Sequence, residues 1–286
     1  MLLRLLFTLA LFHFASSALA DNNVVHKLSS GIEAVARYTP GEKQKPVILI
    51  LHGFLTTNNF NTVLSLDRML RENGFSVLAP TITLGIHRRD SGFACKAIHT
   101  NTIEDDVREI ADWVDWLVKK GHKNIILLGH SQGSMKLLAY LSQDKAPKEV
   151  KLLIASSLSY IDAFIGSKEK QKYIAQAQKA VQNKITQPGT YSLAYCKNDY
   201  VAPAEVYLSW AHWDEERVIS AINQSQIPVY VVMGGRDRYF NSYWINKIKK
   251  SKANITTIKQ ASHFFDGNEE FDYHDVILQQ LEEAPY

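Results

Sequence analysis

The sequence predicts an α/β fold in which helices cover both faces of a mostly parallel, doubly wound sheet. Short apolar runs with the length of buried strands recur along the chain and alternate with segments whose apolar residues have helical spacing. Such alternation is typical of parallel sheets with helices on both faces. The chain has 286 residues, of which 46% are hydrophobic and 21% charged. This composition excludes wholesale disorder and fits one or two globular domains.

Charge and cysteine content exclude other classes of protein. The 32 Lys and Arg residues exceed the 29 Asp and Glu residues by only three, and no block of like charge stands out. We therefore expect no nucleic-acid partner, because nucleic-acid binding needs basic residues clustered on one face. Two cysteines are too few for a disulfide-rich scaffold or a four-cysteine metal site, and we expect no bound metal.

Residues 1–20 form a candidate export signal. The segment carries one cation, Arg4, then a run rich in Leu, Phe and Ala without an acidic residue, and it ends in Ala-Leu-Ala at 18–20. A small-x-small triplet of this kind precedes the cut made by signal peptidase. The apolar run is shorter than the roughly 20 residues of a membrane-spanning helix, as is every later one. We expect a mature chain that begins at Asp21, is periplasmic or secreted, and makes no stable membrane insertion.

The core strands are expected in six apolar runs. In chain order they lie at residues 47–51, 75–78, 125–128, 150–155 and 229–233, with a weaker run at 255–258. Continuous runs of this length fit strands that are buried on both faces of a parallel sheet. The clearest helical pattern covers residues 102–120, where Thr102 and Asp105 resemble a helix N-cap.

One interval, from residue 160 to 227, breaks the alternation. It is longer than a crossover between parallel strands requires, and its second half is rich in tyrosine and tryptophan. We interpret it as a helical, aromatic-rich cap inserted between two parts of a core, residues 21–159 and 228–286. The alternative is a set of extra surface helices that only pack on the core.

The sequence Gly-His-Ser-Gln-Gly at 129–133 directly follows the third apolar run and precedes a helical pattern. A G-x-S-x-G motif between a strand and a helix holds its serine on a sharp, strained turn, which exposes the hydroxyl to a substrate. We therefore predict that Ser131 is a nucleophile. His130, at the first x position, is expected to turn away from the substrate and to pack in the core.

A serine hydroxyl needs a positioned base, and the base needs an orienting carboxylate. His263 is the best candidate for the base, because it lies between the last weak strand and the C-terminal helical pattern. Asp237 is the favoured acid, because it follows the fifth run at the sheet edge where open α/β sheets place their sites. Asp162 and Asp266 are the alternatives.

Two backbone N–H groups are predicted to bind the oxyanion that forms during acyl transfer. One belongs to Gln132, at the start of the helix after the nucleophile. The other belongs to Phe54, in the loop after the first apolar run, where Gly53 lets the chain approach closely.

The four motifs together resemble the α/β-hydrolase superfamily. They read Leu-His-Gly-Phe at 51–54, Gly-His-Ser-Gln-Gly at 129–133, Gly-Gly-Arg-Asp at 234–237 and Ser-His-Phe at 262–264. The resemblance runs from about residue 47 to the C-terminus, and the order serine, aspartate, histidine is that of the superfamily. It implies a sheet of the α/β-hydrolase type and a capped serine hydrolase, most often of carboxylic esters, without a cofactor.

We expect an exported serine esterase that acts on a small-molecule ester. The aromatic interval favours an apolar acyl or aryl group. An amidase or peptidase of the same fold is one alternative, because the same triad chemistry cleaves amides. A non-catalytic exported binding protein on a hydrolase scaffold is the other.

Cys95 and Cys196 are expected to form a disulfide. An exported protein meets an oxidising compartment, where a lone pair of cysteines tends to close. The bridge would tie the cap to a loop of the core. Two separate thiols are the alternative, because the sequence fixes no distance between them.

Overall fold

The computed structural model describes residues 23–143, 146–240 and 242–284, so the predicted export signal lies outside the described residues. Its centre is an eight-stranded sheet in the spatial order β1-β2-β4-β3-β5-β6-β9-β10, in which β1, β2 and β4 pair antiparallel and the remaining pairs are parallel. The strands are β1 (Asn23–Lys27), β2 (Glu33–Thr39), β3 (Val47–Leu51), β4 (Ser76–Thr81), β5 (Ile125–His130), β6 (Val150–Ser156), β9 (Val229–Gly234) and β10 (Asn254–Ile258).

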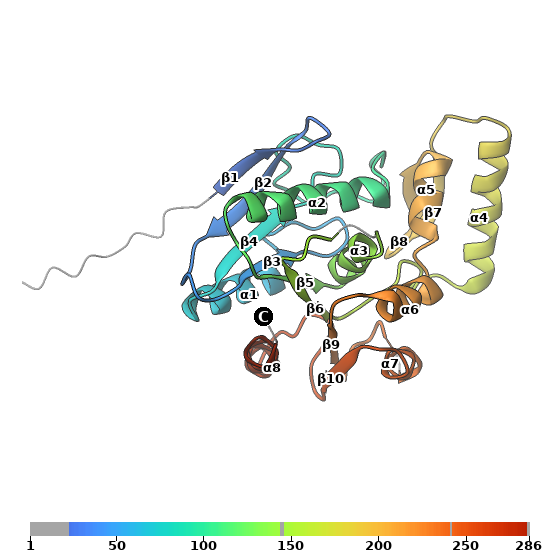
Figure 1. The fold of residues 1–286 in the computed structure, drawn as a ribbon. Coiled ribbons are helices and arrows are strands. Elements are labelled where there is room, and N and C mark those ends of the chain that lie inside the picture. The colour runs from blue at the N-terminus through green and yellow to red at the C-terminus, as the bar shows by residue number, and fades with distance from the viewer. Residues whose placement is uncertain (1–22, 144–145, 241, 285–286) are drawn as a thin grey trace, which may run out of the picture.

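Helices cover both faces of this sheet (Figure 1). One face packs against α1 (Asn61–Glu72) and α8 (Glu269–Glu283), and the other against α2 (Ile103–Lys119), α3 (Gln132–Leu141) and α6 (Glu215–Gln224). Successive residues of a strand enter opposite layers: in β3, Leu49 joins the layer of α2, whereas Ile48 joins the layer of α1. The predicted doubly wound, mostly parallel sheet is confirmed.

The six predicted apolar runs correspond to β3, β4, β5, β6, β9 and β10, and the predicted N-cap opens α2. The Thr102 hydroxyl accepts from the N–H of Asp105, whose carboxylate accepts from the N–H of Thr102. The sequence did not predict β1 and β2. Positions of β1 are exposed or half-buried and most positions of β2 are half-buried, so neither strand has a continuous apolar run.

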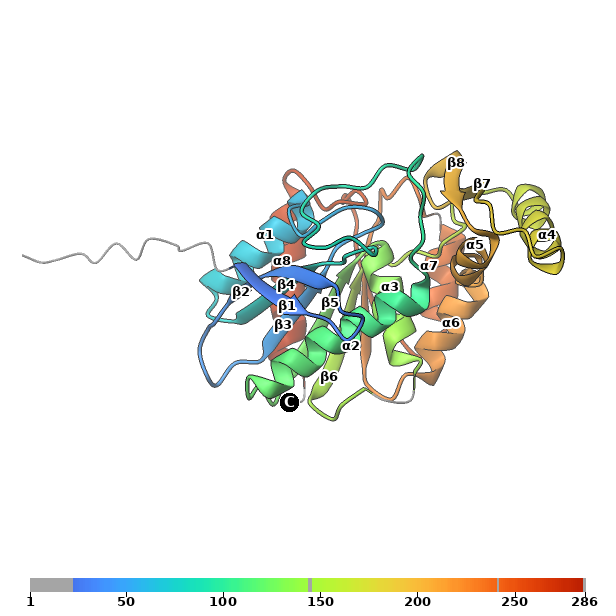
Figure 2. The same cartoon turned by 90° about the horizontal axis from the view of Figure 1, so that it is seen from above.

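The interval between β6 and β9 holds α4 (Ser167–Gln182), β7 (Gly189–Leu193), β8 (Cys196–Ala202), α5 (Ala204–Ala211) and α6. It is therefore not only helical, since β7 and β8 form an antiparallel hairpin with a two-residue turn, Ala194-Tyr195. In Figures 1 and 2, α4, the hairpin and α5 lie together beside the sheet, and α6 returns to pack on α3. In the described ranges, every helix is too short or too polar to cross a membrane.

Candidate active site

Ser131 lies on a tight turn between β5 and α3, with φ 56° and ψ −125°. A positive φ is costly for a residue with a Cβ, so it persists only where the surroundings enforce it. A Cβ on Gly129 would lie 2.5 Å from the backbone of Ser134, and one on Gly133 would lie 2.3 Å from the carbonyl oxygen of Leu51. The packing of the turn therefore requires both glycines of the motif.

Ser131, His263 and Asp237 form a continuous chain of hydrogen bonds. The Ser131 hydroxyl lies 3.0 Å from Nε2 of His263, and Nδ1 of His263 lies 2.8 Å from one carboxylate oxygen of Asp237. The other oxygen of Asp237 accepts from the N–H of Tyr239 at 2.8 Å, which fixes the carboxylate. With Nδ1 donating to Asp237, Nε2 is left to accept the serine proton. The distances suit a nucleophile, a base and its orienting acid.

These three side chains follow the carboxyl ends of three parallel strands, β5, β9 and β10. The topology thus brings them to one sheet edge although Ser131 and His263 are 132 positions apart. The two alternative acids have other partners. Asp162 pairs with Lys170 at 2.8 Å, and Asp266 accepts from the hydroxyl of Ser262.

Two groups that the sequence did not assign to the site hold the backbone of His263. Nε2 of His130 lies 2.9 Å from the His263 carbonyl oxygen, and the Ser157 hydroxyl donates to the same oxygen at 2.6 Å. Burial lowers the pKa of His130 to about 3, so its ring is neutral and donates from Nε2. His130 is buried as expected, but it does not turn away from the pocket at Ser131, since it is one of the residues that line it, and it also positions the candidate base.

The predicted oxyanion donors lie beside Ser131. Gln132 is the first residue of α3, where a backbone N–H has no acceptor within the helix and the helix dipole favours negative charge. The loop after β3 passes close to the serine, since a Cβ on Gly53 would lie 3.5 Å from the Ser131 Cβ. The N–H of Phe54 belongs to the next residue of that loop.

His52 orients the peptide between Gly53 and Phe54. Its Nε2 accepts from the N–H of Ile82 at 3.0 Å, so its Nδ1 carries the proton and donates to the Gly53 carbonyl oxygen at 2.8 Å. The Thr56 hydroxyl donates to the same oxygen at 3.2 Å. Because the peptide is trans, the N–H of Phe54 points away from that carbonyl. Burial lowers the pKa of His52 well below its usual value, so this neutral tautomer persists.

A pocket of about 260 Å³ contains the Ser131 hydroxyl. Six Phe and Tyr side chains contribute to its wall. Among its lining residues, only the histidines have side chains that can titrate near neutral pH. The lining residues are Gly53, Phe54, Thr56, Phe60, His130, Ser131, Gln132, Phe164, Ala194, Tyr195, Tyr239, His263 and Phe264. The interval between β6 and β9 supplies three of them, so it forms part of the wall.

Cys95 and Cys196 are joined by the predicted disulfide, with their Cα atoms 5.5 Å apart. Cys95 lies in the loop between β4 and α2, and Cys196 is the first residue of β8. The bridge therefore ties the hairpin to a core loop. It also removes both thiolates as metal ligands, although the carboxylate of Asp199 lies near them.

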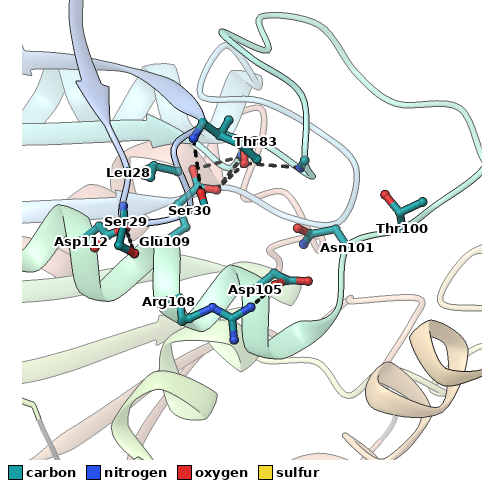
Figure 3. Close-up of a pocket in the computed structure, with 12 residues that line it drawn as sticks. Leu28, Ser29, Ser30, Thr83, Thr100, Asn101, Asp105, Arg108, Glu109 and Asp112 are labelled. Atoms are coloured by element: carbon teal, nitrogen blue, oxygen red, sulfur yellow. Dashed lines mark hydrogen bonds and ion pairs between the residues drawn. The ribbon is translucent and has the colours of Figure 1, made fainter.

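A second pocket, of about 170 Å³, shares no lining residue with the first and lies between the β1–β2 turn and the N-terminal half of α2 (Figure 3). At its base the buried Glu109 accepts from the N–H and the hydroxyl of Thr83. At its rim the carboxylate of Asp112 accepts from the N–H and hydroxyl of Ser29. Burial raises the pKa of Glu109 to about 7.

Comparisons with known proteins agree with this architecture. A family described as the alpha/beta hydrolase fold matches residues 46–190. Est1E from Butyrivibrio proteoclasticus, also solved with ferulic acid bound, has a TM-score of 0.62 at 16% identity over 92% of this chain and 100% of its own. Alpha/beta hydrolase domain-containing protein 10 from mouse has a TM-score of 0.64 at 15% identity over 91% and 98%. An esterase from Pyrococcus furiosus has a TM-score of 0.61 at 14% identity over 92% and 90%.

Comparison with curated protein sequences gives no match. Identities of 14–16% to the solved structures show a common fold and carry no information on the substrate of this chain. The family match covers just over half of the chain and includes both the loop after β3 and the turn that bears Ser131. The structural likeness extends over the remaining core. The chain belongs to the α/β-hydrolase fold family.

Proposed function

We propose that this protein is an exported serine hydrolase that cleaves carboxylic esters with an apolar acyl or aryl group. The observation that carries the proposal is the unbroken hydrogen-bond chain from Ser131 through His263 to Asp237 inside an aromatic pocket. A serine, a base and a buried carboxylate in this order are the parts that acyl transfer through a covalent intermediate needs.

In the proposed mechanism, His263 removes the proton from Ser131 as the hydroxyl oxygen attacks the ester carbonyl. Asp237 holds the imidazole in the required tautomer and stabilises the imidazolium. The N–H groups of Phe54 and Gln132 donate to the oxyanion. His263 then protonates the leaving alcohol, which leaves an acyl group on Ser131. In the second half, His263 takes a proton from water, whose oxygen attacks the acyl carbonyl and releases the acid.

The lining of the pocket supports an uncharged, apolar substrate. Its aromatic side chains offer apolar area, and no Lys, Arg, Asp or Glu is available there to neutralise a charged substrate group. The interval from 160 to 227 acts as the cap in this proposal, since Phe164, Ala194 and Tyr195 contribute to the wall. Export through the signal at residues 1–20 is supported by the disulfide, because disulfides persist in oxidising compartments.

The test is labelling of the purified mature protein with a fluorophosphonate probe, combined with hydrolysis of p-nitrophenyl esters from acetate to decanoate and of the benzoate. We expect labelling of the wild type, loss of labelling in Ser131→Ala, and hydrolysis that prefers the longer or aromatic acyl groups. Matched p-nitroanilides distinguish an amidase from an esterase.

A second set of variants tests whether the residues act as a unit. Ser131→Ala and His263→Ala should each remove nearly all activity, and the double variant should be little worse than either single variant. Absence of both labelling and hydrolysis in the folded wild type would instead favour the binding protein.

A further inference from the structure

We propose that Tyr195, secured by the Cys95–Cys196 disulfide, is a positioning residue that holds the oxyanion-binding turn in its active conformation. This inference rests on the proposed function, because it assigns a task only if the N–H of Phe54 binds an oxyanion. The disulfide joins Cys95 and Cys196, which are 101 positions apart in the chain.

Phe54 connects the oxyanion loop to the hairpin through both its backbone and its side chain. Its carbonyl oxygen accepts a hydrogen bond from the Tyr195 hydroxyl at 3.1 Å. Its ring lies edge-on to Tyr195, with centroids 5.5 Å apart, and also contacts Tyr200 and Trp210 at 6.2 and 6.1 Å. The residue that supplies the N–H is therefore held on its other side by the β7–β8 hairpin and α5.

The next residue shows why this turn needs external support. Leu55 has a φ of 55°, which is unfavourable for a residue with a branched side chain and persists only where neighbouring groups enforce it. Its carbonyl oxygen accepts from the N–H of Phe93 at 2.9 Å. The two consecutive carbonyls of the turn thus have donors from two different segments, Tyr195 from the hairpin and Phe93 from the loop before α2.

The disulfide joins those two segments next to the donors. Cys196 directly follows Tyr195, and Cys95 lies two residues after Phe93. We call the two hydrogen bonds and the disulfide together the turn clamp. Since Gly53 is already fixed by His52 and Thr56, the clamp completes the restraint on the chain at Phe54.

The clamp can be removed without removing the hairpin. The base of the hairpin has its own contacts with the core: Val201 accepts from the N–H of His99 at 2.8 Å, and the rings of His99 and Tyr200 stack with centroids 4.3 Å apart. Tyr195 itself is 51% exposed, so the loss of its hydroxyl affects the free energy of unfolding little.

Tyr195→Phe tests the proposal, because it deletes the hydrogen bond and keeps the ring against Phe54. With p-nitrophenyl butyrate we expect kcat to fall about tenfold and KM to change less than about twofold, since loss of a whole oxyanion donor costs about 10²–10³ in kcat and here the donor is only misplaced. Affinity for phenylboronic acid, which forms a tetrahedral adduct with the serine, should fall in parallel with kcat. The melting temperature should stay within about 2 °C.

Tyr191→Phe is the matched control, because Tyr191 lies in the same hairpin and stacks on Tyr207 rather than on the oxyanion loop. Cys95→Ala with Cys196→Ala should reproduce the fall in kcat, and adding Tyr195→Phe should lower kcat by less than the product of the two effects.

A Tyr195→Phe variant whose kcat and boronate affinity lie within twofold of the wild type would overturn the proposal, whatever the cysteine variants do. Equal losses in Tyr195→Phe and Tyr191→Phe would also overturn it, since they would indicate a general effect on the hairpin. Fluorophosphonate labelling of the wild type distinguishes failure of the clamp from failure of the proposed function. A wild type that is labelled at Ser131 with an unaffected Tyr195→Phe variant refutes the clamp alone, whereas an unlabelled wild type refutes the proposed function and the clamp with it.

Discussion

His130 and His263 are neighbouring imidazoles, with ring centroids 5.3 Å apart, yet their surroundings give them different tasks. His130 is buried and neutral, and it donates to a backbone carbonyl. His263 lies at the pocket, between a hydroxyl and a carboxylate. In the proposed mechanism the carboxylate partner is what makes His263 suitable as a base, because it would stabilise an imidazolium at that ring.

Replacement of that partner is the sharpest test at the residue scale. We expect Asp237→Asn to lower kcat for p-nitrophenyl butyrate by about 10⁴, because an amide holds the imidazole in the wrong tautomer. Asp162→Asn is the matched control, since its carboxylate faces Lys170, and its kcat should stay within a fewfold of the wild type. A larger loss in Asp162→Asn than in Asp237→Asn would contradict the assignment.

The buried carboxyl of Glu109 should make the free energy of unfolding depend on pH. Its pKa is raised from 4.5 to about 7 by burial, so the folded protein binds this proton more tightly than the unfolded chain. Its contribution to stability is fully present below about pH 4.5 and is lost as the pH rises through about 7. Glu109→Gln cannot ionise, so the variant does not lose this contribution. As the pH rises over this range, the free energy of unfolding of the variant should therefore increase relative to that of the wild type, by at most about 3 kcal/mol.

Urea unfolding of both proteins at pH 4.5 and pH 8 measures this gain. Glu104→Gln, on the exposed side of the same helix, is the matched control for a lost carboxylate. A difference between Glu109→Gln and the wild type that is the same at both pH values would show that the buried carboxyl does not titrate in this range.

Some residues of the candidate site could be named from the sequence because residue type and chain position together indicate chemistry. Ser131 lies in a strand–turn–helix motif, and His263 lies in the loop before the last helix. His52, Thr56 and Tyr195 were not assigned, because each is joined to the loop after β3 by a hydrogen bond to a backbone carbonyl. Such bonds arise where loops meet in space, and no local sequence pattern encodes them.

At the scale of elements, the contact between α2 and α3 contains a fully buried ion pair. The Lys136 ammonium lies 2.6 Å from the Asp106 carboxylate, and both side chains are at most 1% exposed. Burial raises the pKa of Asp106, and the nearby ammonium opposes that rise. Each charge therefore depends on the other, since neither can reach water.

Removal of one charge should cost more than removal of both. Lys136→Met leaves a buried carboxylate without its counter-charge, and we expect a loss of about 3–5 kcal/mol in the free energy of unfolding. Lys136→Met combined with Asp106→Leu should recover most of that loss. Urea unfolding at pH 7 provides the measurement, and a double variant that is less stable than Lys136→Met would contradict the prediction.

The strands that the sequence did not predict were missed for one physical reason. Central strands such as β3 and β5 are buried on both faces and read as apolar runs, so they were identified. In contrast, no position of β1 is fully buried, most positions of β2 are only half-buried, and the β7–β8 hairpin mixes exposed and buried positions. The pairing of these strands depends on tertiary contacts. A short strand of this kind resembles a loop in sequence.

At the scale of the whole molecule, alternation of strands and helices is enough to predict the layers but not the placement of the interval between β6 and β9. The layers follow from local apolar periodicity, which places helices on both faces of the sheet. The interval is fixed instead by aromatic contacts with the core, such as His99 on Tyr200, and by the disulfide. Its length predicted an insertion, and its composition predicted that the insertion is rich in aromatic residues.

Export is a prediction about the whole chain. Expression of the full sequence in a Gram-negative bacterial host should give a periplasmic protein whose intact mass corresponds to a chain that begins at Asp21, because signal peptidase cuts after Ala-Leu-Ala at 18–20. Substitution of Ala20 by a bulky residue should block the cut and provides the control. A mature protein that retains residues 1–20 in the wild type would contradict the prediction.

The disulfide also determines the products of limited proteolysis. Residues 183–188, between α4 and β7, are all exposed, and they include Lys184. This segment lies inside the loop that Cys95 and Cys196 close, so trypsin cleavage after Lys184 would give two fragments that remain covalently linked. Ser131 would be on one fragment and His263 on the other, and the two would separate only after denaturation with a reducing agent. The disulfide thus allows the chain to be cleaved in the most exposed stretch of the insertion while both fragments stay covalently joined.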